Sequence, residues 1–327
     1  MTSLHIAEAF AVFVFIIGFL ALYIDLRIAL ILIKKIAAKI SGKTVPQTPL
    51  FKRKSDKILA IAAVTVTMLA ALCSIDAFLI EPYHLDVNLI SLPSSSLPRG
   101  KTIKIAHITD THMEKALPLH KEIITELQKF SPDLIVLTGD YMNHSKATKC
   151  FEEFAAALPP IAPTYAIDGN WDEERISRKI FPRTGVCYMD GEIKKILVKD
   201  TPICLIGTPF NGYYQWKEAE PEIPTTGTLN IVLTHSPDLI PLAAKSGKAH
   251  FYFCGHSHGG QVRLPFYGAL VTLCDTGKKY EMGLYHVENM FAYTNRGVGM
   301  EGGMAPRVRF LCPPEIALFT ISGTEGN

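Results

Sequence analysis

The chain has 327 residues, a formal net charge of +2 and 48% hydrophobic side chains. That length allows one large domain with an appendage, and the hydrophobic share is at the upper end for a soluble protein. The small net charge argues against a nucleic-acid partner, and seven singly scattered cysteines weakly favour a reducing compartment over a disulfide framework.

Two long apolar runs open the chain. The first runs from Ala9 to Ile33 and is interrupted only by Asp25 and Arg27. The second runs from Ile58 to Ile80 and is interrupted only by Asp76. Both approach the roughly 20 residues that a spanning helix needs, and the N-terminus lacks the basic segment of a cleaved signal peptide. We expect two membrane helices, about 9–33 and 58–80; the alternative is that one run is an interfacial or packed helix.

The segment between these runs is strongly basic and contains Asp56 as its one acidic residue. Such a segment is typical of a cytoplasmic loop or of a surface that touches anionic lipid. If both runs span, the large C-terminal part lies on the opposite face of the membrane. If only one run spans, or if the pair forms a shallow hairpin, that part stays on the cytoplasmic side. The basic residues are Lys34, Lys35, Lys39, Lys43, Lys52, Arg53, Lys54 and Lys57.

The remainder of the chain has the pattern of one α/β domain. Residues 1–81 are expected to form the membrane anchor, and residues 82–100, rich in proline and serine, a linker. From there, over 101–327, strand-like apolar runs alternate with helical patterns such as Pro118–Phe130. From Val271 to Ile321 strands and turns predominate, which indicates a further sheet within the same domain.

Five short polar clusters each follow directly after a strand-like apolar run. The runs are continuously apolar and rich in β-branched or aromatic residues, as expected of strands buried on both faces. At the carboxyl ends of such strands, carboxylates and imidazoles can hold two cations about 3.5 to 4 Å apart around a phosphate. Each glycine that precedes a ligand lets the backbone approach closely. The clusters are Asp110-Thr111-His112, Gly139-Asp140, Gly169-Asn170-Trp171-Asp172, His235 and Gly255-His256-Ser257-His258.

This ordered set resembles the signature of the calcineurin-like metallophosphoesterase superfamily. The resemblance covers the chain from about residue 101 and implies a four-layer α/β/β/α sandwich, preceded here by the N-terminal membrane helices. It also implies two divalent metal ions and a hydroxide between them that attacks phosphorus. Mixed oxygen and nitrogen donors favour Mn²⁺, with Fe or Zn as alternatives. The implied catalytic ligands are Asp110, His112, Asp140 and His258 for one metal, and Asp140, Asn170, His235 and His256 for the other.

The segments around 259–265, 295–299 and 313–316 resemble the membrane-associated bacterial branch of the superfamily. Two arginines in these segments, Arg263 and Arg296, together with Asn170, are candidates for binding a substrate phosphate. The alternative for both arginines is a solvated or structural role.

One position departs from the family pattern, which usually has Gly-Asn-His at the third cluster. That histidine is held to protonate the leaving oxygen, whereas this chain has Trp171. Indole N–H has negligible acidity, so general-acid catalysis worth about 10²- to 10⁴-fold is lost from this position. A leaving group that is stable as an anion, such as the phosphate released from a pyrophosphate, would suffer little. The alternative is that Trp171 only packs and that another residue, such as His144, supplies the proton.

Membrane attachment and a stable leaving group together predict a lipid that carries a nucleoside diphosphate or another phosphoanhydride as substrate. This description is similar to the UDP-2,3-diacylglucosamine pyrophosphatases of lipid A biosynthesis, in particular the chlamydial type, which release UMP and lipid X. The resemblance implies a bacterial inner membrane with the catalytic domain on its cytoplasmic face. Aromatic residues that could line a route for acyl chains, or equally pack in the core, are Phe210, Tyr213, Tyr214 and Trp216.

Two other functions remain open. The first is an extracytoplasmic phosphodiesterase or phosphatase of unknown substrate, which the basic segment favours. The second is a non-catalytic scaffold built on a decayed phosphoesterase. The presence of all seven expected ligands argues against decay.

Overall fold

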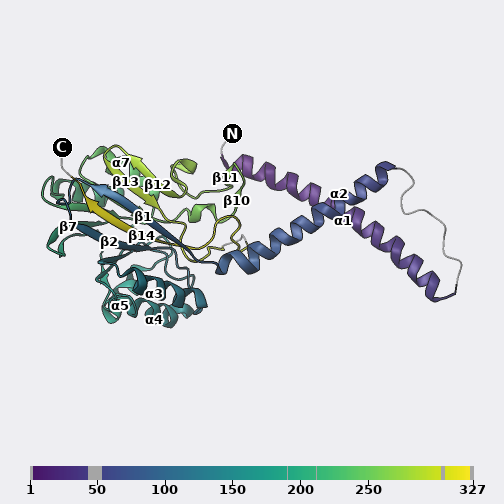
Figure 1. Ribbon diagram of the computed structural model, residues 1–327, viewed down its shortest axis with the longest axis horizontal. Helices are drawn as coiled ribbons and strands as arrows, with labels where there is room; N and C mark the ends of the chain where they lie inside the picture. The colour runs from purple at the N-terminus through teal and green to yellow at the C-terminus, as the bar shows by residue number, and fades with distance from the viewer. Residues whose placement is uncertain (1–2, 43–53, 190, 211, 303–305, 325–327) are drawn as a thin grey trace. The chain divides into compact units, whose positions relative to one another are not determined.

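The computed structural model describes residues 3–42, 54–189, 191–210, 212–302 and 306–324 (Figure 1). The chain divides into two compact units, Met1–Leu79 and Ile80–Asn327.

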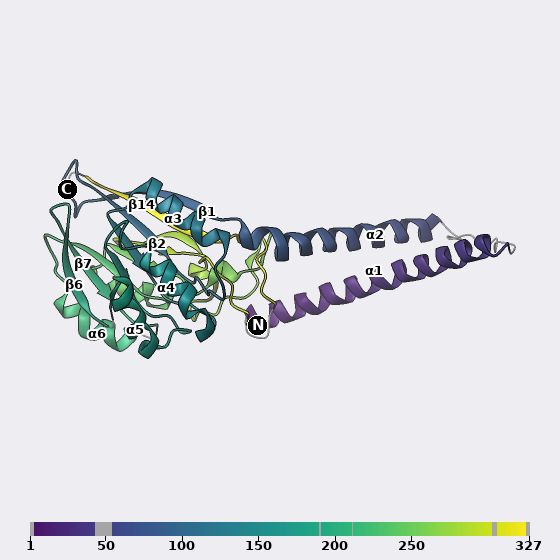
Figure 2. The same ribbon diagram turned by 90° about the horizontal axis from the view of Figure 1, so that it is seen from below.

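The first unit is built from two long helices that contact each other (Figure 2). Helix α1 spans Ser3–Ile40 and helix α2 spans Lys54–Ile75, which a π-helical turn continues through Asp76–Ile80. Within them, Ile16–Ile40 and Lys54–Tyr83 are long and apolar enough to cross a membrane and are almost entirely exposed. By length and composition, both are therefore candidate spans.

Both helices are longer than the predicted 9–33 and 58–80. Lysine is a good helix former, so α1 stays helical through Lys34, Lys35 and Lys39 after its apolar run has ended. The hydropathy pattern locates the apolar part of a helix and not its ends. Of the predicted basic loop, residues 43–53 lie outside the described residues.

The second unit is built on two six-stranded sheets, ordered β1-β14-β2-β3-β4-β5 and β12-β13-β9-β8-β7-β6. Parallel pairing joins β2, β3, β4 and β5 in the first sheet and β13, β9, β8 and β7 in the second. The first sheet contains β1 (Asp86–Ser94), β2 (Thr102–Ile108), β3 (Leu134–Leu137), β4 (Thr164–Ala166), β5 (Cys187–Tyr188) and β14 (Glu315–Gly323). The second contains β6 (Ile193–Val198), β7 (Thr201–Gly207), β8 (Leu229–Leu233), β9 (Phe251–Cys254), β12 (Gly283–Val287) and β13 (Met290–Thr294).

Alternating side chains divide the unit into four layers. On β2, Ile103 and Ile105 join the core between the sheets, whereas Ala106 and Ile108 join the core beneath three helices. Figure 1 shows α3, α4 and α5 on one side of the strands and α7 on the other. The predicted α/β/β/α sandwich is therefore confirmed. The helices are α3 (Pro118–Phe130), α4 (Thr148–Ala156), α5 (Glu174–Thr184), α6 (Tyr213–Ala219) and α7 (Ile240–Lys245).

The predicted linker at 82–100 is wrong, because β1 lies within it and pairs in parallel with β14 along its whole length. Prolines and serines cluster at its end, around 93–98, and obscured the strand-like run that precedes them. The unit also begins earlier than residue 101. The buried Glu81 carboxylate accepts hydrogen bonds from the backbone N–H groups of Leu311, at 2.7 Å, and Cys312.

The strands predicted between residues 271 and 321 are present, but they serve different sheets. Strands β12 and β13 extend the second sheet, and β14 lies in the first sheet between β1 and β2. Because β14 is antiparallel to β2, it is the exception in that sheet to the parallel pairing.

A buried arginine stabilises the loop that follows β13. The Arg309 guanidinium donates hydrogen bonds to the carbonyl oxygens of Arg296, Gly297, Gly299 and Cys312 at 2.6 to 3.0 Å. This loop lies against the first polar cluster: a Cβ added to Gly297 would be 2.5 Å from the Cβ of Asp110. Arg309 therefore holds the backbone on which that cluster rests.

We expect Arg309→Met to lower the Tm by about 5 to 10 °C, because it leaves several buried carbonyl groups without a donor. The measurement is a thermal scan of the purified full chain, monitored by near-UV circular dichroism. Arg178→Met is the matched control, since Arg178 forms an exposed pair with Glu174. Its Tm should change by less than about 2 °C. Equal shifts for the two variants would contradict the assigned role of Arg309.

Candidate metal centre

The five predicted clusters meet where the carboxyl ends of strands from both sheets come together. Three clusters follow β2, β3 and β4, and two follow β8 and β9. Six of the seven predicted ligands form two groups whose donor atoms lie within 4.8 Å of one another, and all six are buried. The groups are Asp110, His112, Asp140 and His258, and Asp140, His235 and His256.

The distances between donor atoms suit a shared cation. His258 Nε2 lies 3.1 Å from Asp110 Oδ1 and 3.1 Å from His112 Nε2. Two donors that each lie ~2.1 Å from one ion are about 3.0 to 3.5 Å apart at octahedral or tetrahedral angles. The first group therefore has the spacing of ligands around one metal ion.

Asp140 belongs to both groups through a single oxygen. Its Oδ2 lies 3.5 Å from His112 Nε2, in the first group, and 3.1 Å from His235 Nε2, in the second. Its Oδ1 points elsewhere and accepts the backbone N–H of Trp171 at 2.8 Å. The carboxylate is thus oriented to bridge two cations.

Hydrogen bonds to the far side of three imidazoles set which nitrogen is available to a metal. His235 Nδ1 lies 2.6 Å from Thr138 O, and His256 Nε2 lies 3.1 Å from Leu273 O. A carbonyl accepts only from N–H, so the opposite ring nitrogen carries the lone pair. Buried His235 Nε2 has no hydrogen-bond partner in the described parts of the chain. A buried lone pair directed at carboxylates fits a bound cation.

The third imidazole is held by a residue that the sequence did not single out. His112 Nδ1 lies 2.8 Å from Asn143 Oδ1, and Asn143 Nδ2 donates to the carbonyl of His112 at 2.9 Å. These two bonds fix both the ring and the backbone of His112. In metal sites such supporting residues typically change metal affinity or activity 10- to 100-fold when mutated.

The electrostatics of the two groups are those of a cation site. Burial opposes ionisation of Asp110, yet His258 and His235 hold the pKa of its carboxyl well below the usual range. Burial would lower the pKa of His235, but Asp140 and Asp110 outweigh it and raise the pKa to about 10 when no metal is bound, so a cation would take the place of the proton on Nε2. Burial and His258 lower the pKa of His112 to about 4. Two ionised carboxylates thus face imidazoles in a dry site, an arrangement that favours a dication.

The backbone is strained at the ligands themselves. Five of the seven predicted ligands adopt positive φ angles, a region that non-glycine residues rarely occupy. Such strain persists only where the surrounding structure enforces it, and it clusters at functional sites. The angles are +48° at Asp110, +38° at His112, +56° at Asp140, +67° at His256 and +50° at His258.

The glycines before the ligands are required by close backbone contacts, as predicted. An added Cβ would lie 2.3 Å from Gly169 N at Gly139 and 2.1 Å from Asp140 Oδ1 at Gly169. At Gly255 it would lie 2.0 Å from Asp110 Oδ2. The ligand loops therefore pack at distances that only glycine allows.

Asp172 joins two of these loops, a role that sequence reasoning missed although the residue lies in the third cluster. Its carboxylate accepts the backbone N–H groups of Asp140 at 2.6 Å, Tyr141 at 2.9 Å and Gly169 at 2.8 Å. The Asp140 loop and the Gly169 loop are thereby fixed together. An aspartate two residues after the asparagine of the cluster was the available signal.

The remaining residues of the third cluster lie at the rim. Asn170 is exposed, and its predicted metal contact stays a prediction. The indole of Trp171 meets the His112 ring edge-on, with centroids 5.8 Å apart, and its Nε1 donates to Glu301 Oε1 at 3.2 Å. His144, the alternative proton donor, lies 3.7 Å from Glu114 Oε1 and is half exposed.

Both predicted phosphate-binding arginines form ion pairs within the fold, which favours their structural alternative, and their contact with a substrate phosphate stays a prediction. Arg296 is buried and forms ion pairs with Glu315 and Asp86, each at 2.5 Å. Arg263 pairs with Glu281 at 2.8 Å. The guanidinium groups of both residues are engaged in ion pairs within the fold. Sequence alone did not predict these pairs, because the partners come from other segments of the chain.

The four aromatic residues considered for a lipid route separate into three groups. The Trp216 side chain is fully buried and packs in the same core cluster as Cys204, so it does not line a route for lipid. Tyr213 and Tyr214 are exposed. Phe210 lies against the metal ligands, with its ring centroid 4.7 Å from that of His256.

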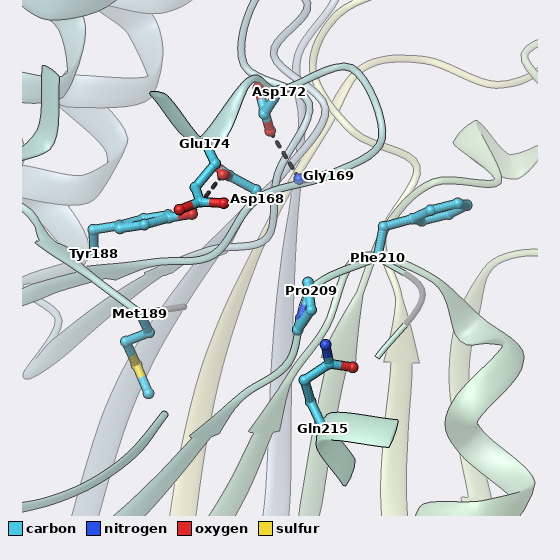
Figure 3. A pocket seen from close by; sticks show the side chains of 9 residues that line it. All are labelled: Asp168, Gly169, Asp172, Glu174, Tyr188, Met189, Pro209, Phe210 and Gln215. Atoms are coloured by element: carbon cyan, nitrogen blue, oxygen red, sulfur yellow. Dashed lines mark hydrogen bonds between the residues drawn. The ribbon is translucent and has the colours of Figure 1, made fainter. Parts of the chain in front are cut away.

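A cavity of about 260 Å³ borders this centre. Figure 3 shows Phe210 and Gln215 on one side of it and Asp168, Glu174 and Tyr188 on the other. Its lining thus combines carboxylates, a phenol and an amide, with Phe210 shared between the cavity and the metal ligands.

Comparison with known proteins agrees with this geometry. Residues 103–260 match the family described as Calcineurin-like phosphoesterase. An uncharacterized metallophosphoesterase of Bacillus subtilis, YkuE, is 29% identical over 75% of this chain and 88% of its own length. The phosphodiesterase YaeI of Escherichia coli is 28% identical over 67% and 82%. The UDP-2,3-diacylglucosamine pyrophosphatase LpxG of Chlamydia muridarum is 26% identical over 72% and 90%. With its ligand groups assembled, the chain contains a calcineurin-like metallophosphoesterase domain, matched over residues 103–260.

Proposed function

We propose that the chain is a membrane-anchored hydrolase that uses two divalent cations, Mn²⁺ first among them, to cleave the pyrophosphate bond of UDP-2,3-diacylglucosamine. The products are UMP and lipid X. The observation that carries the dinuclear part is the Asp140 carboxylate, whose single oxygen Oδ2 faces both ligand groups. When bound, the cations supply Lewis acidity and a nucleophile from water at neutral pH.

The protein side of the reaction depends on preorganisation. Asp140 is held from its other oxygen by the Trp171 N–H, and His112 and His235 are held from their far nitrogens. Ligands fixed in this way need no rearrangement when charge develops on the phosphate, which is the main source of electrostatic catalysis.

The absence of a proton donor at position 171 supports a phosphoanhydride substrate. The Trp171 indole is a neutral donor, and it is already bonded to Glu301. The neighbouring His112 has its pKa lowered to about 4 by burial and His258, so it is a poor acid at neutral pH. A nucleoside monophosphate leaves as a stable anion and needs little protonation, unlike an alkoxide.

The lining of the cavity beside Phe210 supports a substrate that carries an uncharged polar group next to the scissile bond. The Tyr188 hydroxyl donates to Asp168, and Glu174 pairs with Arg178. The Gln215 amide, whose buried Oε1 has no hydrogen-bond partner among the described residues, suits the hydroxyl or amide groups of a sugar or base. A nucleoside or a sugar fits this chemistry. The LpxG relatives and the two candidate spans support a lipid on the other side of the bond.

This function requires an inner membrane with the metal centre on the cytoplasmic face. The second candidate is an extracytoplasmic phosphodiesterase, supported by the YaeI relative and by the basic segment between the helices. A reporter enzyme fused after Asn327 distinguishes them, because its activity depends on the side of the membrane. A cytoplasmic signal is expected; a periplasmic signal would contradict the proposed substrate.

The direct test is hydrolysis by detergent-purified protein with Mn²⁺. We expect UMP release from UDP-2,3-diacylglucosamine, measurable turnover of a bis-aryl phosphodiester, whose phenolate also leaves as a stable anion, and slow turnover of the monoester glycerol 3-phosphate, whose leaving group is an alkoxide. Product chromatography measures all three. Rapid hydrolysis of the monoester would overturn the argument from Trp171.

Asp140→Asn should abolish binding of the metal pair and lower kcat/KM by on the order of 10³-fold, since a neutral amide is a poor bridge. Metal content after dialysis, measured by mass spectrometry, is the primary readout. Asp200→Asn is a matched control: Asp200 also has a positive φ, +61°, but is exposed in the turn between β6 and β7. Retention of two metals by Asp140→Asn would refute the bridging role.

Trp171→His should raise the rate with a phosphodiester that releases an alkoxide by about 10- to 100-fold, because it restores an acid beside the leaving group. The rate with the pyrophosphate should change less than about threefold. Trp171→Phe keeps the aromatic packing without adding an acid and should leave the ratio of the two rates unchanged. Equal gains for both substrates would show that proton donation does not select the leaving group.

A further inference from the structure

A small hairpin in the second unit exposes an apolar surface. Strand β10 (Arg263–Leu264) pairs with β11 (Gly268–Ala269), and Phe266 at the tip is fully exposed with a φ of +64°. A surface cavity of about 400 Å³ lies between the hairpin and Leu311. We define the hairpin patch as the exposed residues Phe266, Tyr267, Val271, Leu273 and Leu311.

The hairpin patch is connected to the metal ligands. At its base, Arg263 Nη1 donates to the carbonyl of Gly259, the residue after His258, at 2.7 Å. The carbonyl of Leu273 accepts from His256 Nε2 at 3.1 Å. The segment that carries the exposed side chains is therefore hydrogen-bonded to the loop of His256 and His258.

The hairpin patch is also connected to the point where the chain leaves the second candidate span. That span runs through Lys54–Tyr83, and the second unit begins at Ile80. Glu81 binds the backbone of Leu311 and Cys312, and Leu311 lines the same cavity as Phe266. If residues 54–83 cross a bilayer, the bilayer surface lies at Glu81 and hence beside the hairpin patch.

The polar groups around the hairpin suit a lipid headgroup region. Lys278 Nζ lies 3.5 Å from the centroid of the Tyr267 ring and donates to the Tyr267 carbonyl, and Lys279 is exposed. Aromatic residues with an adjacent cation are typical of the membrane interface, where the ring contacts lipid and the ammonium group contacts phosphate.

We propose that the hairpin patch inserts into the bilayer surface from which the second span emerges. This step rests on the proposed membrane anchorage. It places the boundary of the lipid phase beside the loop that carries His256 and His258, so the scissile phosphate of a lipid-linked substrate reaches the ligands while its acyl chains stay in the membrane. Arg263 then serves to hold the inserted hairpin on the ligand loop.

The test is fluorescence quenching of the full chain in phosphatidylcholine–phosphatidylglycerol vesicles whose acyl chains carry bromine. Phe266→Trp adds a third tryptophan to the two native ones. We expect the added fluorescence to fall by at least about half, because a side chain buried in the interface contacts the brominated chains. The matched control is Leu197→Trp, since Leu197 is equally an exposed apolar residue but lies on β6 at the edge of the second sheet.

A second variant gives a functional readout. Phe266→Ser should raise the apparent KM for the lipid-linked substrate in vesicles by about tenfold and leave hydrolysis of a water-soluble bis-aryl diester unchanged. Quenching of Phe266→Trp no stronger than that of Leu197→Trp would overturn the proposal. Cross-linking of position 266 to a second copy without quenching would overturn it as well.

These outcomes separate the hairpin from the proposed substrate. Quenching needs no turnover, so clear quenching without UMP release supports membrane insertion and refutes only the choice of lipid. Release of the chain from membranes by alkaline carbonate would refute the anchorage and the inserted hairpin together, while the soluble-diester assay still reports the metal centre.

Discussion

The metal centre depends on the carboxylate of Asp140. One of its oxygens is fixed by a hydrogen bond, and the other faces both ligand groups. Asp140 receives the Trp171 N–H on Oδ1 and presents Oδ2 to His112 and His235. The Asp172 carboxylate accepts hydrogen bonds from the backbone of both loops that this contact joins, the Asp140 loop and the Gly169 loop. Two adjacent loops are thus fixed by acceptors that the protein itself supplies. The positive φ angles at the ligands are tolerated because this network leaves the backbone no alternative.

The fold supplies this network by bringing two sheets together at one edge. The grouped donors after β2 and β3 come from the first sheet, and those after β8 and β9 come from the second. The core between the sheets fixes their separation, because side chains such as Ile105 and Phe253 interdigitate there. The spacing between donor atoms is therefore set by packing over the whole domain and not by any single loop.

Sequence reasoning predicted the sandwich and the ligand clusters because short apolar strands followed by polar turns are local signals. It missed Asn143, whose partner His112 comes from another loop, and Arg309, because the backbone conformation that brings its carbonyl partners together has no local sequence signal. It also did not predict the ion pairs of Arg263 and Arg296, since neither glutamate partner is adjacent in sequence. Strand β1 was mistaken for a linker because an edge strand needs little apolar patterning once a long neighbour such as β14 provides its hydrogen bonds.

The position of β14 has a consequence for how the protein is made. This strand, Glu315–Gly323, separates β1 from β2, so the first sheet cannot close before nearly the whole chain has left the ribosome. At about 5 to 20 residues per second, the helices near the N-terminus emerge roughly 10 to 50 seconds earlier in translation than β14 does. The two candidate spans are thus made before the metal centre can assemble, and a chain cut short before Glu315 would carry both helices without a complete first sheet.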